Sequence, residues 1–167
     1  MSTQTQDAAE SSEVGELVAI WIKPVHRGPM LPRQSAQLTN GGLEGNVHRR
    51  GRRRLTLLDA DAWARAEADL GQTVDPVNRR ANLMLRGLDL EGSRGRVLCL
   101  GTCRIEILGE TRPCRLMDDA APGLERALGP EWRGGVFGRA LDDGEIALGD
   151  PAAFVAGQAR LRGSVRD

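Results

Sequence analysis

The stretch that most constrains the fold is RGRVLCLGTCRIEILGE, residues 94–110. Two aliphatic runs meet at a Gly-Thr pair, residues 101–102, and Cys103, Ile105 and Ile107 then alternate with charged residues. An apolar residue at every second position is the period of a strand with one buried face. The sequence therefore predicts two strands joined at the Gly-Thr pair, the second of them half buried.

Other short runs have the same character, because each is aliphatic or β-branched and is bounded by turn residues. We predict strands over residues 16–22, 54–59 and 81–87, and two more within 134–150. The last two flank an Asp-Asp-Gly sequence at residues 142–144, and a turn of this composition between two strands favours a β-hairpin.

One longer segment has helical spacing instead. Asp59 or Asp61 is placed to cap the start of this helix, and Gly71 occupies the position at which helices commonly end. A second, short helix is predicted over residues 121–129. The apolar face of the first helix would consist of Ala62, Trp63, Ala66 and Leu70.

Many short strands, glycine-rich turns and few helices predict a mainly β, barrel-like domain. A chain of 167 residues suits one such domain with a real core. We place this domain at residues 14–156, between polar tails at 1–13 and 157–167.

Composition excludes several classes of function. The net charge of zero and the scarcity of aromatic residues argue against a nucleic-acid partner, and no apolar run is long enough to span a membrane. Three cysteines do not suit a disulfide framework, and the first residues lack the basic and apolar parts of a secretory signal. These observations predict a cytoplasmic protein with neither a nucleic-acid nor a membrane partner.

Cys114 is the candidate for chemistry. It follows Pro113 in the polar sequence GETRPCRLMDD, and Arg112 and Arg115 flank the Pro-Cys pair. Nearby cations stabilise a thiolate, the form of cysteine that binds metals and attacks electrophiles, if their side chains turn toward the sulfur. The pattern leaves two interpretations open, a reactive thiol or an incidental loop cysteine. The other cysteines, Cys99 and Cys103, fit small core residues of the strand pair better than a zinc site.

Two arginine-rich segments are candidates for anion binding. In HRRGRRR, residues 48–54, a nucleic-acid patch, a solvated loop or an inward-facing arginine are all compatible with the pattern, and strand alternation favours Arg53 for the last role. In NRRANL, Arg79, Arg80 and Asn82 offer guanidinium forks and an amide suited to a phosphate or a pterin ring, and a surface turn is the alternative.

The ordered set GGLEGNVH, RRLTLLDADAW, RRANLMLRGLDL, RGRVLCLGTCRIEILGETRPC and RGGVFGRALDDGEIALGD resembles the MOSC domain, the module found at the C-terminus of molybdenum cofactor sulfurases and in stand-alone bacterial proteins. The resemblance spans roughly residues 14–155 and implies a β-barrel-rich fold.

The resemblance also implies a site. The family's invariant cysteine corresponds to Cys114, which would ligate the metal of the molybdenum cofactor, molybdopterin. A soft thiolate suits such a metal, and arginine forks suit the phosphate of the pterin. The residues that would grip or line the cofactor are Arg80, Asn82, Arg79, Arg53, Thr56, Thr111 and Arg112.

One departure from the family pattern concerns residues 45–46. The family often has Gly-Asp there, whereas this chain has Gly45-Asn46, which removes a carboxylate near His48 and leaves the role of His48 open.

Three hypotheses of function follow. The first is a molybdoenzyme that reduces a small N-hydroxylated or N-oxide compound, with Cys114 as metal ligand and a separate reductase as electron donor. The second is a carrier in which Cys114 holds a persulfide, or the domain holds the cofactor, for delivery to a client molybdoenzyme. The third is a binding module for a phosphorylated ligand in which Cys114 has no part.

Overall fold

The computed structural model describes residues 13–47 and 54–156, and these residues are mainly β. The strands are β1 (Gly15–Ile22), β2 (Leu31–Arg33), β3 (Ser35–Thr39), β4 (Gly42–Leu43), β5 (Leu55–Asp59), β6 (Leu83–Arg86), β7 (Val97–Leu100), β8 (Cys103–Glu110), β9 (Val136–Ala140), β10 (Gly144–Ala147) and β11 (Pro151–Phe154). The helices are α2 (Ala60–Leu70) and α3 (Leu124–Ala127), and the 3₁₀ turns are η1 (Pro76–Arg79), η2 (Arg115–Asp119) and η3 (Pro130–Trp132).

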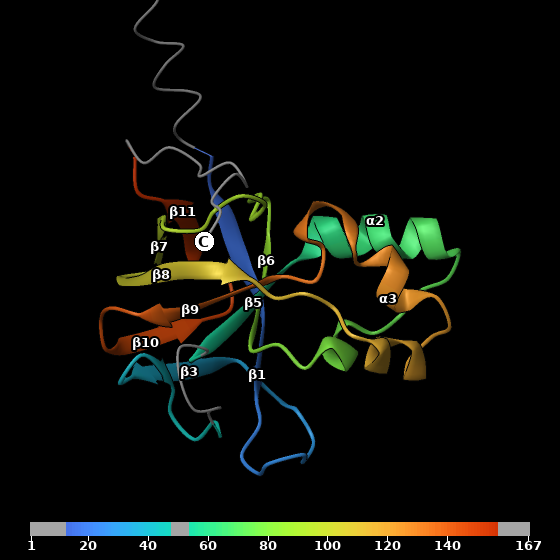
Figure 1. The fold of residues 1–167 in the computed structure, drawn as a ribbon. Helices are drawn as coiled ribbons and strands as arrows, with labels where there is room; N and C mark the ends of the chain where they lie inside the picture. The colour runs from blue at the N-terminus through green and yellow to red at the C-terminus, as the bar shows by residue number, and fades with distance from the viewer. Residues whose placement is uncertain (1–12, 48–53, 157–167) are drawn as a thin grey trace, which may run out of the picture.

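Seven strands form a closed barrel in the order β11-β7-β8-β9-β5-β6-β1, and the pairing of β11 with β1 closes it. Strand β2 adds to the free part of β1, and β10, β3 and β4 form a separate three-stranded sheet. The helices and 3₁₀ turns gather on one side of the barrel (Figure 1). The predicted fold class, a mainly β barrel with a few short helices, is confirmed.

The barrel strands follow the sequence pattern that predicted them. Strands β7 and β8 pair antiparallel across the Gly-Thr pair, with Leu100 opposite Cys103, and Cys103, Ile105 and Ile107 point into the barrel core. Strands β5 and β6 are parallel, and α2 provides the crossover that a parallel pair requires.

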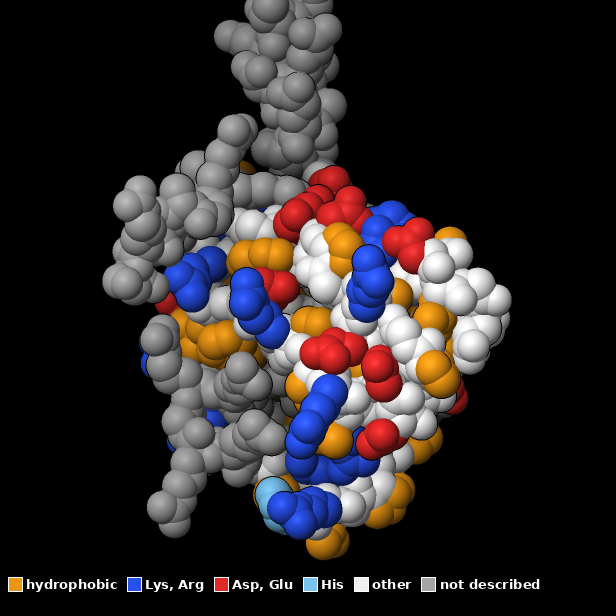
Figure 2. Space-filling view, turned by 45° about the vertical axis from the view of Figure 1, so that its right-hand side comes forward, with side chains coloured by type: hydrophobic (Ala, Val, Ile, Leu, Met, Phe, Trp, Pro, Cys, Tyr) orange, Lys and Arg blue, Asp and Glu red, His pale blue; other side chains and the backbone are white. Residues whose placement is uncertain are grey.

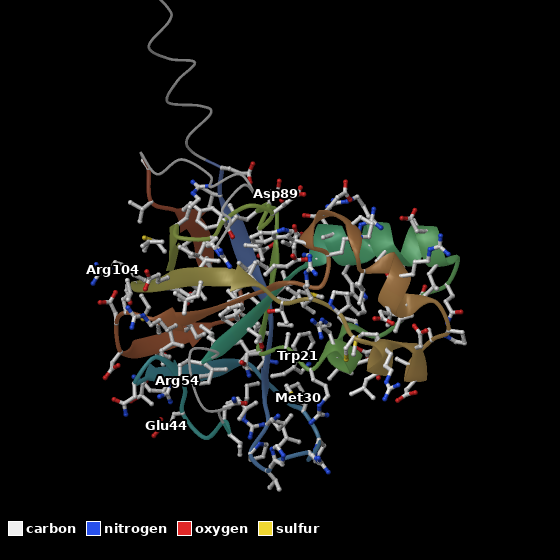
Figure 3. All side chains as sticks on the ribbon, in the orientation of Figure 1. Trp21, Met30, Glu44, Arg54, Asp89 and Arg104 are labelled. Carbon is white, nitrogen blue, oxygen red and sulfur yellow. The ribbon has the colours of Figure 1, made fainter. Side chains whose placement is uncertain are left out.

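Strands β1, β5 and β6 each place side chains in two different cores, one on each face of the strand. Neighbouring residues of β5, Leu57 and Leu58, belong to the barrel core and to a second, outer core respectively. The same division separates Ile20 from Trp21 in β1. The outer core lies between the barrel and the helical layer, where Trp21 and Met30 lie close together (Figure 3). Burial on both faces explains why these strands are continuous apolar runs in the sequence.

Helix α2 has the ends that the sequence predicted. The carboxylate of Asp59 caps it by accepting hydrogen bonds from the backbone N–H groups of Asp61 and Ala62. Gly71 ends it in the left-handed conformation at φ 80°, and its N–H donates to the carbonyl of Glu67. The second predicted helix is shorter than expected, since α3 covers only Leu124–Ala127 of the segment 121–129.

The predicted hairpin between β9 and β10 is wrong. Strand β10 pairs with β3 in the separate sheet, while β9 lies between β8 and β5 in the barrel. The intervening turn is held by more distant groups: the Asp142 carboxylate accepts from both the backbone and the guanidinium of Arg104, and Asp143 accepts from the backbone of Asn40. These contacts turn the chain out of the barrel, and the turn sequence alone does not encode them.

The predicted terminal tails lie outside the described residues apart from Glu13. Within residues 13–47 and 54–156, no helix combines the length and the apolar character that a membrane crossing requires. On the face shown in Figure 2, arginine side chains alternate with acidic and hydrophobic ones, so neither sign of charge dominates that face.

The Asp59 cap gives a first prediction. Burial raises the pKa of the Asp59 carboxyl from its ordinary value of 3.8, against the two backbone hydrogen bonds that lower it. We expect Asp59→Ala to reduce the free energy of unfolding by about 0.5–2 kcal/mol, whereas Asp59→Asn keeps the capping oxygen and stays within about 1 kcal/mol of the wild type. Urea denaturation measures both, with Asp119→Ala, at an exposed aspartate, as the control.

The same substitution has a pH dependence whose sign is fixed. Because the folded-state pKa is raised, the native state binds the proton more tightly, and wild-type stability falls as pH rises from the ordinary aspartate value through the folded-state pKa. Asp59→Asn lacks this loss, so its stability relative to the wild type should improve over that interval. A relative decline of the Asn variant over the same interval would contradict the assignment.

Candidate functional site

Cys114 lies in the loop that leaves β8 and crosses from the barrel to the helical layer (Figure 1). Its side chain is exposed, and its backbone is extended at φ −125° and ψ 171°. The Cys114 carbonyl accepts from the N–H of Met117, whose side chain is buried in the outer core. The thiol therefore stands at the start of a turn that is anchored immediately after it.

The loop before the cysteine, residues 111–114, rests on two glycines that follow η3. The N–H of Thr111 donates to the Gly135 carbonyl at 2.8 Å. A Cβ atom on Gly134 would lie 2.6 Å from the Thr111 carbonyl oxygen and 3.1 Å from Pro113 Cδ. The first of these distances is shorter than real Cβ contacts, so only glycine lets the two segments pack this closely.

Arg79 fastens the cysteine loop to η1. Its Nε donates to the Gly134 carbonyl at 2.9 Å, and its Nη2 donates to the carbonyls of Thr111 at 3.0 Å and Arg112 at 3.3 Å. The sequence predicted Arg79 as an anion ligand. In the structure its guanidinium is bound to backbone carbonyls of the turn at Gly134 and of the cysteine loop, and its role as an anion ligand stays a prediction.

Arg80 points to a different segment from its neighbour. It adopts a left-handed backbone conformation at φ 60°, and its Nη2 donates to the Gly28 carbonyl in the segment between β1 and β2. Its side chain remains exposed. Consecutive arginines thus hold two different loops, one on each side of η1.

Asn82 is buried and forms a hub between β1, β5 and β6. Its Oδ1 accepts from the N–H of Thr56 at 3.2 Å and from the Thr56 hydroxyl at 3.2 Å. Its Nδ2 donates to the Trp21 carbonyl at 3.3 Å and to Asn46 Oδ1 at 3.2 Å. In return, the Asn82 N–H donates to the carbonyl and the hydroxyl of Thr56. The amide is engaged within the protein, so a direct contact with a ligand would require it to give up one of these bonds.

Asn46 belongs to the same network, which the sequence did not indicate. Its Oδ1 accepts from the Lys23 N–H at 2.7 Å as well as from Asn82, and its Nδ2 donates to the Val47 carbonyl. An aspartate would supply the accepting oxygen but could not donate to Val47. Asn46 therefore links these segments through hydrogen bonds, although it lacks the carboxylate that the family often has near His48. His48 and Arg53 themselves lie outside the described residues.

The arginines beside the cysteine face solvent. Arg112 has 87% of its side chain exposed, and its Nε lies 3.8 Å from Glu110 Oε1. Burial raises the pKa of the Glu110 carboxyl, and Arg112 opposes this rise. Arg115 is also exposed. Both guanidinium groups lie at the protein surface, where a ligand could contact them.

The Thr111 hydroxyl is the unusual polar group of the site. The residue is only 9% exposed, and its Oγ1 is buried without a hydrogen-bond partner among the described residues. An unsatisfied buried hydroxyl costs free energy, which a ligand would recover by hydrogen bonding to it. This atom adjoins the Arg79 contacts and lies three residues before Cys114 in the chain.

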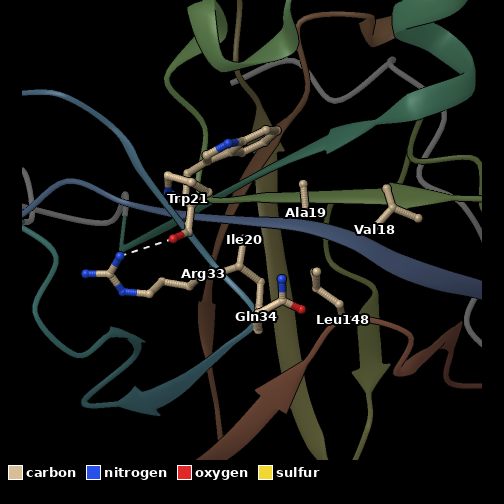
Figure 4. Close-up of a pocket in the computed structure, with 8 residues that line it drawn as sticks. Val18, Ala19, Ile20, Trp21, Arg33, Gln34 and Leu148 are labelled. Carbon is tan, nitrogen blue, oxygen red and sulfur yellow. Dashed lines mark hydrogen bonds between the residues drawn. The ribbon is translucent and has the colours of Figure 1, made fainter.

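The other cysteines and the pocket in Figure 4 lie elsewhere. Cys103 belongs to the barrel core and Cys99 is half buried in β7. Figure 4 shows a pocket of about 250 Å³ on β1 and β2, where Arg33 donates to the carbonyl of Pro32. It is lined by Val18, Ala19, Ile20, Trp21, Pro32, Arg33, Gln34 and Leu148, none of which belongs to the cysteine loop.

Comparison with known proteins identifies the family. Residues 44–153 match the model of the MOSC domain. The chain belongs to the MOSC domain family. MOSC domains are associated with binding of the molybdenum cofactor. The exposed thiol of Cys114 fits such a group, together with the exposed arginines and with the Thr111 hydroxyl, which has no partner among the described residues.

Solved structures of low sequence identity share this MOSC fold. The YUAD protein from Bacillus subtilis has a TM-score of 0.74 at 16% identity, covering 84% of this chain and 95% of its own. YiiM from Geobacillus stearothermophilus has a TM-score of 0.68 at 19% identity, covering 88% and 78%. YiiM from Escherichia coli has a TM-score of 0.66 at 15% identity, covering 87% and 72%. A search of curated proteins gives no match.

The family match begins at residue 44, yet earlier residues contact the residues of the candidate site. The carbonyls of Trp21 and Gly28 and the N–H of Lys23 bind Asn82, Arg80 and Asn46 respectively. All three are backbone groups, so no side-chain pattern in the sequence could have revealed them. Strand β1 and the segment after it are thus part of the site.

The Asn82 hub gives a second prediction. We expect Asn82→Ala to lower the free energy of unfolding by about 2–4 kcal/mol, because it leaves several buried groups without partners. Asn78→Ala is the matched control, since its exposed amide makes one hydrogen bond, to the Asp75 carbonyl. Urea denaturation of the two variants separates these cases, and equal losses would show that Asn82 is not a hub.

Proposed function

We propose that this MOSC domain binds the molybdenum cofactor with Cys114 as the protein ligand of the metal, and that it reduces small N-hydroxylated or N-oxide compounds. The observation that carries the proposal is an exposed thiol on a loop fixed by Arg79 and Gly135, three residues after a buried hydroxyl that has no partner among the described residues. Membership of a family associated with this cofactor supports it.

The residues of the site would divide into two groups. Cys114 would bind the metal, the Thr111 hydroxyl would hydrogen-bond the bound group, and the exposed guanidinium groups of Arg80 and Arg112 would bind its phosphate as forked donors. Arg53 remains a further predicted ligand on the basis of the sequence. Arg79, Asn82 and Thr56 would act by holding the site together, because their polar groups bind the protein itself.

The chemistry that the cofactor supplies when bound is two-electron redox chemistry at a soft-ligated metal. The contribution of this chain is to fix the sulfur by the turn at η2, to hold the loop on Gly134 and Gly135, and to leave the thiol open to a small molecule. Reduction of an N-hydroxylated compound to an amine and water consumes two electrons and two protons, and the electrons would come from a separate reductase.

A second candidate, a carrier of sulfur or cofactor for a client molybdoenzyme, is favoured by one observation. The Cys114 side chain is exposed, as transfer of a persulfide to another protein requires. Both proposals place the chemistry on the same sulfur, so they are separated by what that sulfur carries.

The third prediction concerns metal content. In a host that makes the cofactor, we expect the purified wild type to hold on the order of one molybdenum atom per chain, and Cys114→Ala to lose most of it, because the thiolate is the only protein atom proposed to bind the metal. Cys99→Ala, which removes a half-buried thiol of β7, should retain the metal. Elemental analysis measures the content, and thermal melting confirms folding. Equal molybdenum in Cys114→Ala would overturn the ligand assignment.

The fourth prediction tests the carrier. After incubation with a cysteine desulfurase and free cysteine, a carrier should gain the mass of one sulfur atom on Cys114, and a reductant should remove it. Intact-mass spectrometry with peptide mapping locates the adduct, and Cys99 serves as the internal control thiol. If Cys114 gains no reducible sulfur under conditions in which the desulfurase is active, the persulfide carrier is rejected.

A further inference from the structure

Among the described residues the buried arginine is Arg133, which has 8% of its surface exposed. Its Nη1 donates to Asp69 Oδ2 at 2.6 Å and to the Ala127 carbonyl at 3.0 Å. Its Nη2 and Nε donate to Glu131 Oε1 at 2.9 and 3.1 Å. One guanidinium thus joins the end of α2, the end of α3 and its own turn. We call the set Asp69, Glu131 and Arg133 the ionic lock.

The ionic lock joins one guanidinium to two carboxylates. Hydrogen bonding to Asp69 is the main cause that raises the pKa of Arg133, and hydrogen bonding from Arg133 is the main cause that lowers the pKa of Glu131. Arg65 of α2 adds an exposed contact to Glu131, with Nε 3.3 Å from Oε1. Because its pKa is lowered, the Glu131 carboxyl stays ionised to a lower pH than an ordinary glutamate.

The lock encloses a strained turn. Glu131 and Trp132 both have left-handed backbones, at φ 56° and φ 55°. Consecutive residues with side chains rarely adopt this conformation, and they keep it only where surrounding contacts determine it. Here the Glu131 carboxylate is held by Arg133, and Trp132 packs against the barrel core. Backbone bonds from Arg133 to Pro130 and from Gly135 to Trp132 complete the turn.

The strained turn leads directly to the glycines that support the cysteine loop. The Gly134 carbonyl accepts from Arg79, and the Gly135 carbonyl accepts from Thr111. A Cβ on Gly134 would overlap the Thr111 carbonyl oxygen of the cysteine loop, and a Cβ on Gly135 would overlap the Leu57 carbonyl oxygen of β5, so the turn is packed closely against both. A change at Arg133 would therefore displace both acceptors at once.

We propose that Arg133 is a positioning residue of the cysteine site: the ionic lock holds the turn 131–135 in the conformation that aligns the Gly134 and Gly135 carbonyls with Arg79 and Thr111, and so sets the orientation of the Cys114 thiol. This inference rests on the proposed function only in taking Cys114 as the reactive atom. Ion pairs whose carboxylates are about half exposed are a weak source of stability, and two left-handed residues lower stability. The ion pairs and the left-handed residues precede the glycines that contact the cysteine loop. A role in holding the geometry of that loop would explain this position.

The test measures the thiol itself, in cofactor-free protein. The variants are Arg133→Met, Arg133→Lys and the control Arg65→Met, which removes only the exposed contact to Glu131. The rate at which iodoacetamide alkylates Cys114 is followed by peptide mass spectrometry from about pH 6 to about pH 10, the interval in which thiols ionise. Cys103, 1% exposed in the barrel core, reports any global unfolding in the same samples.

We expect Arg133→Met to change the Cys114 rate by about threefold or more, or to shift its pH profile, while Cys103 stays protected. Arg133→Lys should recover part of the change through its contact with Asp69, and Arg65→Met should match the wild type. A folded Arg133→Met protein with the wild-type pH profile would overturn the proposal. If Arg133→Met does not fold, Asp69→Asn and Glu131→Gln weaken the lock while keeping the arginine, and wild-type profiles in both would overturn it equally.

The outcome is independent of the proposed function. A shifted thiol profile in Arg133→Met, together with no molybdenum in the wild type, would uphold the positioning role and reject the molybdoenzyme. Molybdenum in the wild type together with unchanged thiol profiles would support the molybdoenzyme and reject the positioning role of Arg133.

Discussion

The structure depends on the burial of β1, β5 and β6 on both faces, one in the barrel core and the other against the helical layer. A shift of register by one residue would exchange Leu57 with Leu58 and turn the polar Thr56 into the apolar barrel core. This fixed register brings Thr56 opposite Asn82 where β5 and β6 run parallel. The polar hub beneath the site is therefore a consequence of how the barrel and the helical layer share three strands.

Two arginines near the cysteine donate hydrogen bonds to backbone carbonyls. Arg79 binds the carbonyls of Gly134 and Thr111, and Arg80 binds that of Gly28. A guanidinium has several donors in a fixed plane, so one side chain can hold two or three loops at defined distances. This construction leaves the exposed guanidinium groups of Arg112 and Arg115, and the remaining donors of Arg80, as the groups that could contact a ligand.

The strained backbone residues and the contacts that hold them lie next to the glycines that support the cysteine loop. The left-handed residues Glu131 and Trp132 precede two glycines in close contact with the loop, and the buried guanidinium of Arg133 holds them. Within the loop itself, Thr111 keeps a buried hydroxyl without a partner among the described residues. A loop that is held in place by neighbouring segments and has one unused hydrogen-bonding group is what a ligand-binding site requires.

The sequence by itself determined the local features. Alternation in β8, the cap at Asp59 and the glycine at the end of α2 are set by neighbours within a few residues, and the polar turn at Cys114 marked the candidate sulfur. The tertiary structure decided the rest: β10 pairs with β3 rather than β9, Asn82 binds Asn46 and Trp21, and Arg133 joins two helices. These contacts link residues far apart in the chain, often through backbone groups that every residue carries. Local patterns encode period and turns, whereas such pairings depend on which surfaces the closed barrel brings together.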